Sequence, residues 1–130
     1  MLFADASALI AMIAGEDDAD ILADLLEADA DRLCSAIAAW ETVAGLRRSY
    51  AVSIPAAERL VERFLRTFGL RFVDVGEREW RLAVDAYARY GKKRHRAALN
   101  MGDCFAYACA KANRAKLLYK GGDFVHTDLA

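Results

Sequence analysis

The sequence has few residues that break or cross-link a chain. Of its 130 residues one is proline and eight are glycine, which leaves little room for disordered linkers. The three cysteines, Cys34, Cys104 and Cys109, are an odd number without C-x-x-C spacing, which argues against a disulfide framework and against a zinc site. We therefore expect small buried thiols in a single domain over residues 1–130.

Long apolar runs and a basic leader are also missing. No apolar run reaches the roughly 18 residues of a membrane-spanning helix, because Asp5 and the acids from Glu16 onward interrupt the first one. The first residues also lack the positive charge of a signal peptide. The sequence therefore predicts a cytoplasmic protein.

Charge is nearly balanced in total but divided along the chain. The formal net charge is −1, yet residues 16–31 hold eight acids and no base. Residues 89–120 hold nine lysines or arginines and one acid, with the densest group in RYGKKRHR at 89–96. This division favours a polyanionic partner on one face, although a solvated surface would give the same pattern.

Short apolar segments alternate with amphipathic ones. Strands are predicted at 2–4, 32–36, 70–75 and 116–119, and helices at 8–14, 18–30, 35–50, 53–68, 77–90 and 104–115. Alternation of this kind is typical of an α/β protein whose parallel sheet is covered on both faces. We expect a three-layer α/β/α sandwich with a central, mainly parallel sheet of four to five strands.

Helical spacing also predicts which side chains are buried. The faces expected to point inward are Ile21, Leu22, Leu25 and Leu26; Ile37, Trp40 and Ala44; Leu60, Val61, Phe64, Leu65 and Phe68; and Trp80, Ala83, Val84, Tyr87 and Tyr90. Ser35 is the expected cap of the third helix, and Ser53 with Pro55 opens the fourth.

Four acids stand among apolar or small residues instead of on charged faces. Asp5 and Asp123 follow predicted strands, Asp103 lies at the start of the alanine-rich helix, and Glu41 lies in a helix that is poor in charge. In open parallel sheets, ligands bind beyond the carboxyl ends of the strands. We therefore predict that these four carboxylates converge there.

Carboxylates that converge repel one another, and this repulsion has to be offset. At about 5 Å and an effective dielectric near 20, each pair repels by ~3 kcal/mol, so either a cation neutralises the group or the pKa values rise. Mg²⁺ or Mn²⁺ suits carboxylate oxygens, and such a site supports phosphodiester hydrolysis. On spacing alone, helix caps, turns and a salt-bridged glutamate remain an alternative.

Four motifs, in order along essentially the whole chain, carry a family resemblance. They are DASAL after the first strand, WET in the third helix, LNMGDCFAYA, and LLYKGGDFVHTD at the end. Together they resemble PIN-domain ribonucleases, and most closely the VapC-type toxins of type II toxin–antitoxin modules. The resemblance implies a PIN fold and a Mg²⁺- or Mn²⁺-dependent endoribonuclease that cuts structured RNA such as tRNA or rRNA. It also implies a homodimer and a cognate VapB-like antitoxin.

The resemblance further implies roles for the acids. Asp5, Asp103 and Asp123 would bind metal directly, Glu41 would bind it directly or through water, and Asp128 is a weaker fifth candidate. Ser7 and Asn100 would donate hydrogen bonds that fix the carboxylates, or else simply cap the helices that follow them.

The sequence also predicts which residues contact RNA and the antitoxin. The predicted track for RNA phosphates consists of Lys92, Lys93, Arg94 and Arg96, with Arg47 and Arg48 from the third helix. An arginine of the antitoxin would suit the acidic cleft. The apolar groove predicted to hold an antitoxin helix is lined by Leu22, Leu25, Leu26, Trp40 and Leu46.

Two other functions are compatible with parts of the pattern. A PIN-like protein could bind RNA or a partner without cutting it. A receiver-type signalling domain also gathers acids at strand ends, with Asp74 as its only mid-chain phosphoacceptor here, but no acid pair stands beside Asp5.

Overall fold

The sheet is parallel throughout and has four strands. The computed structural model describes residues 1–129, and its strands are β1 (Leu2–Ala4), β2 (Arg32–Cys34), β3 (Arg71–Phe72) and β4 (Lys116–Leu118). They lie in the order β3-β2-β1-β4, and Phe3 of β1 stands opposite Leu33 on one side and Leu117 on the other. All four carboxyl ends therefore meet at one edge of the sheet.

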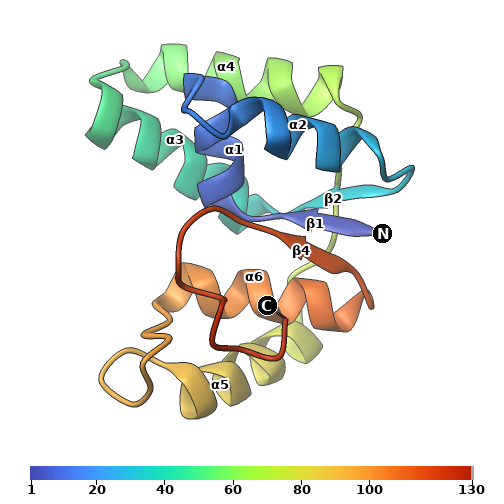
Figure 1. The fold of residues 1–130 in the computed structure, drawn as a ribbon, viewed down its shortest axis with the longest axis vertical. Coiled ribbons are helices and arrows are strands. Elements are labelled where there is room, and N and C mark those ends of the chain that lie inside the picture. Colours follow the sequence, from blue (N-terminus) through green and yellow to red (C-terminus); the bar gives the residue numbers. More distant parts are fainter. Residues whose placement is uncertain (130) are drawn as a thin grey trace.

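Six helices cover the two faces of this sheet. They are α1 (Ala6–Ala14), α2 (Ala19–Glu27), α3 (Ala36–Tyr50), α4 (Ile54–Thr67), α5 (Glu77–Tyr90) and α6 (Met101–Ala112). Helices α1 to α4 lie on one face and α5 with α6 on the other (Figure 1). The predicted α/β/α sandwich is confirmed. No helix in residues 1–129 combines the length and the apolar character that crossing a bilayer demands.

Side-chain caps set where the helices begin. Ser35 accepts a hydrogen bond from the N–H of Ala38 at the start of α3, and Ser53 accepts one from Ala56 at the start of α4. Both caps were predicted. Because Ser35 turns away to cap α3, β2 ends at Cys34 and is shorter than the predicted 32–36.

Strand β3, which precedes α5, is also shorter than predicted. The structure pairs only Arg71 and Phe72 with β2, whereas the sequence predicted a strand over 70–75. Both residues are exposed at the open edge of the sheet. An edge strand makes ladder hydrogen bonds on one side only, so an apolar run here can leave the sheet early.

The core is built from many small side chains. Phe3, Leu9 and Leu33 are fully buried, and α6 is buried around most of its circumference, with Ala106, Ala108, Cys109 and Ala110 among its buried residues. All three cysteines are free and buried, as predicted. Small residues let α6 approach the strands closely, which places its first turn beside the carboxyl edge.

Several large apolar side chains predicted to be buried are exposed. Trp40 is 70% and Trp80 51% exposed, and the other residues of this kind are Ile21, Leu25, Leu60, Val84 and Tyr87. The buried contacts use small residues instead: α3 meets α1 through Ala38, Thr42 and Gly45, and α5 meets α6 through Ala83 and Ala86. Trp40 on α3 and Trp80, Val84 and Tyr87 on α5 therefore point outward, whereas Leu46 and Tyr90 on the same helices are buried.

Candidate active site

Each of the four predicted acids reaches the carboxyl edge of the sheet from a different element. Asp5 directly follows β1, and its N–H donates to the carbonyl of Leu118 at the end of β4, at 2.9 Å. Asp103 lies in the first turn of α6, Glu41 in the second turn of α3, and Asp123 in the segment after β4. The parallel topology is what brings together residues separated by up to 118 positions.

Asp5 is held in one orientation by Ser7. Its side chain is only 4% exposed, and its Oδ2 accepts hydrogen bonds from the backbone N–H of Ser7 at 3.0 Å and from Ser7 Oγ at 2.6 Å. Ser7 Oγ in turn accepts a hydrogen bond from the N–H of Lys120 at 3.0 Å. Asp5 therefore caps α1, and Ser7, inside the first turn, orients Asp5 and joins α1 to the chain beyond β4.

Asp103 is oriented by a reciprocal cap with Asn100. Asn100 Oδ1 accepts from the N–H of Asp103 at 2.9 Å, and Asp103 Oδ2 accepts from the N–H of Asn100 at 3.1 Å. This is a capping box, which fixes the first turn of a helix. The second oxygen of Asp103 takes no part in the cap and remains available for a ligand.

The acids influence one another's ionisation. Burial, and next the charges of Asp123 and Asp5, raise the pKa of Asp103 to about 7. Burial, and next the charge of Asp5, raise the pKa of Glu41 to about 7, against a lowering effect of Arg48. Burial and then Asp123 raise the pKa of Asp5, although the hydrogen bonds from Ser7 oppose this. The carboxylates therefore lie close enough to repel.

Glu41 fits beside α6 only because residue 102 is glycine. A Cβ atom built on Gly102 would overlap the carboxylate of Glu41, with Oε2, Cδ and Oε1 as its nearest neighbours. Gly102 itself is buried. The glycine in the NMGD motif thus provides the space in which a side chain from α3 meets the first turn of α6.

The donor set fits a hard divalent cation. In residues 1–129, no lysine, arginine, histidine or N-terminal nitrogen lies within 4 Å of the carboxylates of Asp5, Glu41, Asp103 or Asp123. As they stand, the His, Cys, Asp and Glu side chains of residues 1–129 form no group of three or more that could hold a metal ion. The fit is therefore one of ligand chemistry, because carboxylate oxygens are what Mg²⁺ accepts and it keeps several waters.

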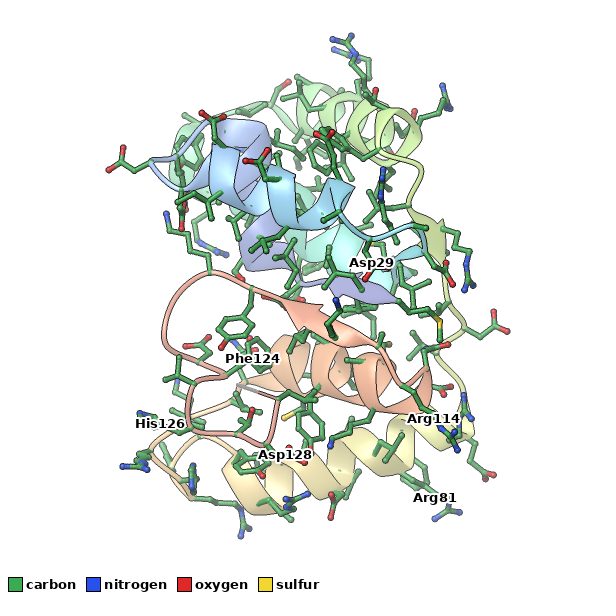
Figure 2. The ribbon with its side chains drawn as sticks, turned by 45° about the vertical axis from the view of Figure 1, so that its right-hand side comes forward. Asp29, Arg81, Arg114, Phe124, His126 and Asp128 are labelled. Carbon is green, nitrogen blue, oxygen red and sulfur yellow. The ribbon has the colours of Figure 1, made fainter. Side chains whose placement is uncertain are left out.

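Asp128, the weaker fifth candidate, makes different contacts. Its Oδ1 accepts a hydrogen bond from Tyr107 Oη at 2.7 Å, and its Oδ2 pairs with Lys111 Nζ at 2.6 Å. Both partners lie further along α6 than Asp103. Figure 2 shows Asp128 and Phe124 on the C-terminal segment, which lies against α6. Both oxygens of Asp128 are thus engaged by protein groups.

The predicted RNA-binding residues fall into two groups. Lys92, Lys93, Arg94 and Arg96 are exposed on the loop between α5 and α6, and this loop leads directly into the Asn100 cap beside Asp103. Arg47 and Arg48 are exposed near the end of α3. Of these two, Arg48 is near enough to Glu41 to lower the pKa of its carboxyl group.

Two residues of the site were not singled out from the sequence. Gly102 was visible only as a letter of the NMGD motif. Lys120 was counted among the basic residues, whereas the structure pairs its Nζ with Asp18 at 3.2 Å and with Glu16, both in the α1–α2 connection. The sequence feature that bears on this contact is the glycine pair at 121 and 122, which predicts a turn before Asp123.

The fold and this arrangement of acids together define a class of protein. The PIN-domain family model matches residues 2–129. A solved structure, that of the sarcin–ricin loop cleaving toxin VapC20 of Mycobacterium tuberculosis, superposes with a TM-score of 0.72 over 95% of this chain and 92% of that one, at 21% identity. The structural likeness extends across the whole sandwich.

Similarity in sequence places the chain more narrowly. VapC ribonuclease Mb0640 of Mycobacterium bovis is 40% identical over 97% of this chain and 94% of its own length. VapC ribonuclease R02377 of Rhizobium meliloti is 39% identical, with 99% of both chains covered. The chain belongs to the VapC ribonucleases of the PIN-domain family. The resemblance expressed by the four motifs is confirmed.

The raised pKa values predict how the metal-free protein responds to pH. Asp103 and Glu41 have pKa values of about 7 in the folded chain, above their ordinary values of 3.8 and 4.5. A raised carboxyl pKa contributes stability that is full below the ordinary value and is lost as pH rises through the folded value. With EDTA present, the Tm should fall by several degrees between about pH 5 and pH 8. Thermal unfolding by circular dichroism measures this.

A matched pair of variants separates this effect from general titration. Asp103→Asn removes one of the raised carboxyl groups and should flatten the slope of Tm against pH. Asp85→Asn removes a carboxylate paired with Arg89 on the exposed side of α5 and should keep the slope. An unchanged slope in Asp103→Asn would contradict the electrostatic account of the site.

Gly102→Ala should damage the site without unfolding the protein. The new Cβ would displace the Glu41 carboxylate, while alanine itself favours a helix by up to about 1 kcal/mol over glycine. We expect the Tm to change little and ribonuclease activity to fall by at least about 10-fold, as for lost positioning contacts. Gly122→Ala is the control, because nothing lies within 4 Å of its added Cβ. Equal activity in the two variants would argue against a role for the Gly102 gap.

Proposed function

We propose that this protein is a Mg²⁺- or Mn²⁺-dependent endoribonuclease toxin, with Asp5, Asp103 and Asp123 as direct metal ligands. Glu41 binds the ion directly or through water. The supporting observation is that these carboxylates meet at one edge of the sheet with no basic partner within 4 Å in residues 1–129. Burial and neighbouring acids raise the pKa values of Asp5, Glu41 and Asp103 there. A divalent cation there neutralises the acids and activates water for attack on a phosphodiester.

The remaining residues of the site orient these ligands. Ser7 fixes one oxygen of Asp5, and Asn100 fixes one oxygen of Asp103, so that the other oxygen of each carboxylate faces the ion. Gly102 leaves room for Glu41. Donors of this kind keep the ligands in place while the metal exchanges.

The proposed substrate is a structured RNA, of the tRNA or rRNA class. Support comes from the exposed basic loop, Lys92, Lys93, Arg94 and Arg96, which adjoins the first turn of α6, and from Arg47 and Arg48 on α3. Cationic side chains on α3 and on the loop before α6 suit a polyanion that must approach the four carboxylates. Attack by water predicts products with 5′-phosphate and 3′-hydroxyl ends.

A cognate VapB-like antitoxin is the proposed protein partner, and its docking groove differs from the one predicted from sequence. Leu22, Leu26 and Leu46 lie in the core and cannot line a groove. A cavity of about 340 Å³ opens instead between α2 and α4, and its lining includes Met12, Ala23, Leu60, Phe64 and Phe68. We propose that an apolar antitoxin helix occupies it and that an antitoxin arginine enters the acidic cleft.

We also propose a homodimer that acts in the cytoplasm, where its RNA substrates are found. Trp80, Val84, Tyr87 and Met101 are exposed and line a cavity of about 510 Å³ on the outer side of α5 and α6. Large apolar side chains gathered on one surface are typical of protein interfaces. This surface lies on the opposite side of the sheet from the proposed antitoxin groove.

The metal-dependent reaction is tested by activity and binding together. Mg²⁺ should support RNA cleavage that EDTA abolishes. Asp5→Asn should lower the rate by at least about 100-fold, since loss of an outer-sphere partner alone costs up to that much. Asp85→Asn, an exposed carboxylate on α5, is the control. Mapping RNA 5′ ends after brief induction, with wild type against Asp103→Asn, would identify the substrate.

Two results would change the proposed function. Cleavage that is equal in EDTA and Mg²⁺ would overturn metal dependence. Mg²⁺-dependent affinity for RNA without cleavage products across total RNA would favour the non-cleaving alternative.

The antitoxin groove is tested by a matched pair on α4. Leu60→Gln lies in the groove, whereas Ile54→Gln changes an exposed apolar residue at the start of the same helix and outside the cavity. We expect Leu60→Gln to weaken antitoxin binding by about 10-fold, in line with an interface anchor, and Ile54→Gln to leave the Kd unchanged. Both variants should keep free ribonuclease activity. Equal antitoxin affinity for both would place the partner elsewhere.

A further inference from the structure

The segment that carries Asp123 has little backbone support. It follows β4, has no regular secondary structure, and its glycines at 121 and 122 are exposed. Within residues 1–129, the backbone of 121–126 makes no hydrogen bond to any helix or strand. Among the proposed ligands, Asp123 is therefore the one that lies neither in a helix nor at a helix cap.

Side chains anchor this segment at its beginning and middle. Lys120 donates through its N–H to Ser7 Oγ at 3.0 Å, and its Nζ pairs with Asp18 at 3.2 Å and with Glu16. Phe124 is 1% exposed and packs against Tyr119 with ring centroids 5.1 Å apart. These contacts fix the chain on both sides of Asp123.

The end of the segment is fixed by Asp128. Its two oxygens accept from Tyr107 Oη at 2.7 Å and from Lys111 Nζ at 2.6 Å. Thr127 links this anchor back toward the metal site, because its N–H and Oγ1 both donate to the carbonyl of Phe124, at 3.1 and 2.8 Å. A rigid turn therefore connects Asp128 to the residue next to Asp123.

The position of these partners on α6 matters. Tyr107 and Lys111 follow Asp103 by four and eight residues, close to one and two helical turns. Asp128 is thus attached to the same helix that presents Asp103. A hydrogen bond to buried Tyr107 and an ion pair with Lys111 together set how the loop lies along this helix.

We propose that Asp128 is a positioning residue, which fixes Asp123 opposite Asp103 through Tyr107 and Lys111 and does not itself bind metal. The proposal rests on the metal-dependent function proposed above. A cation at Asp128 would have to displace the ammonium group of Lys111, whereas the carboxylates of the site have no basic group within 4 Å in the described chain.

Metal affinity distinguishes a positioning residue from a ligand. Tyr107→Phe and Lys111→Met alter only the partners of Asp128 and remove no carboxylate. If Asp128 acts through them, each variant should weaken Mn²⁺ binding by about 10-fold, as should Asp128→Asn. The double variant Asp128→Asn with Lys111→Met should be little weaker than either single one. Isothermal titration of the full chain with Mn²⁺ measures these affinities.

A control variant and the contrary outcomes define the test. Glu77→Gln breaks an exposed ion pair with Arg81 on α5 and should bind Mn²⁺ like wild type. If Asp128→Asn weakens binding as much as Asp123→Asn while Lys111→Met does not, Asp128 is a ligand and the proposal is overturned. Lower Tm values with wild-type Mn²⁺ affinity in all three single variants would overturn it equally.

A second measurement uses the metal-free protein. Amide hydrogen exchange at Thr127 and Leu129, whose N–H groups donate to Phe124 O at 3.1 Å and to Thr127 Oγ1 at 3.2 Å, should accelerate by at least about 10-fold in Asp128→Asn and Lys111→Met. Exchange there should not change in Glu77→Gln, because this variant keeps the Asp128 contacts that limit local opening. Unchanged exchange would overturn the proposal. If wild type binds no Mn²⁺, the proposed function fails, and accelerated exchange would still show that Asp128 fixes the segment.

Discussion

Repulsion among carboxylates at one edge of the sheet is the constraint that the rest of the structure has to satisfy. Parallel strands bring Asp5 and the segment after β4 to this edge, where Asp5 and Asp103 are buried between the two helix layers. Burial alone would drive the acids to take up protons, as the pKa values of about 7 for Glu41 and Asp103 indicate. The fold therefore has to stabilise charge locally before any cation binds.

Helix starts supply much of that stabilisation. Asp5 caps α1, and Asp103 lies in the first turn of α6, so each carboxylate accepts backbone N–H donors at the positive end of a helix dipole. Glu41 has no such cap, since it projects from the second turn of α3, and it depends on the missing side chain of Gly102. Asp5, Asp103 and Glu41 thus use two different local solutions, and both lie in short motifs.

These local solutions explain what could be predicted from the sequence. Strand ends, caps and motif spacing depend on near neighbours, so the α/β/α order, the Ser35 cap and the position of Asp5 after β1 were all accessible. Helix faces were predictable only in part: Leu26, Val61 and Ala83 are buried as predicted. Trp40 and Trp80 are exposed, because they dominate the apolar periodicity while smaller residues make the buried helix contacts. The partners of Asp128, 21 and 17 residues away, leave no pattern in the chain.

The four acids also differ in how firmly the fold holds them. Backbone caps tie Asp5 and Asp103 to the sheet and to α6, two parts of the core. Asp123 lies instead on an irregular segment whose position depends on side chains at its two ends, Lys120 and Asp128. Like charge pushes this segment away from Asp103, and its anchors oppose that force. The geometry of the metal site is therefore set as much by contacts at its periphery as by the acids themselves.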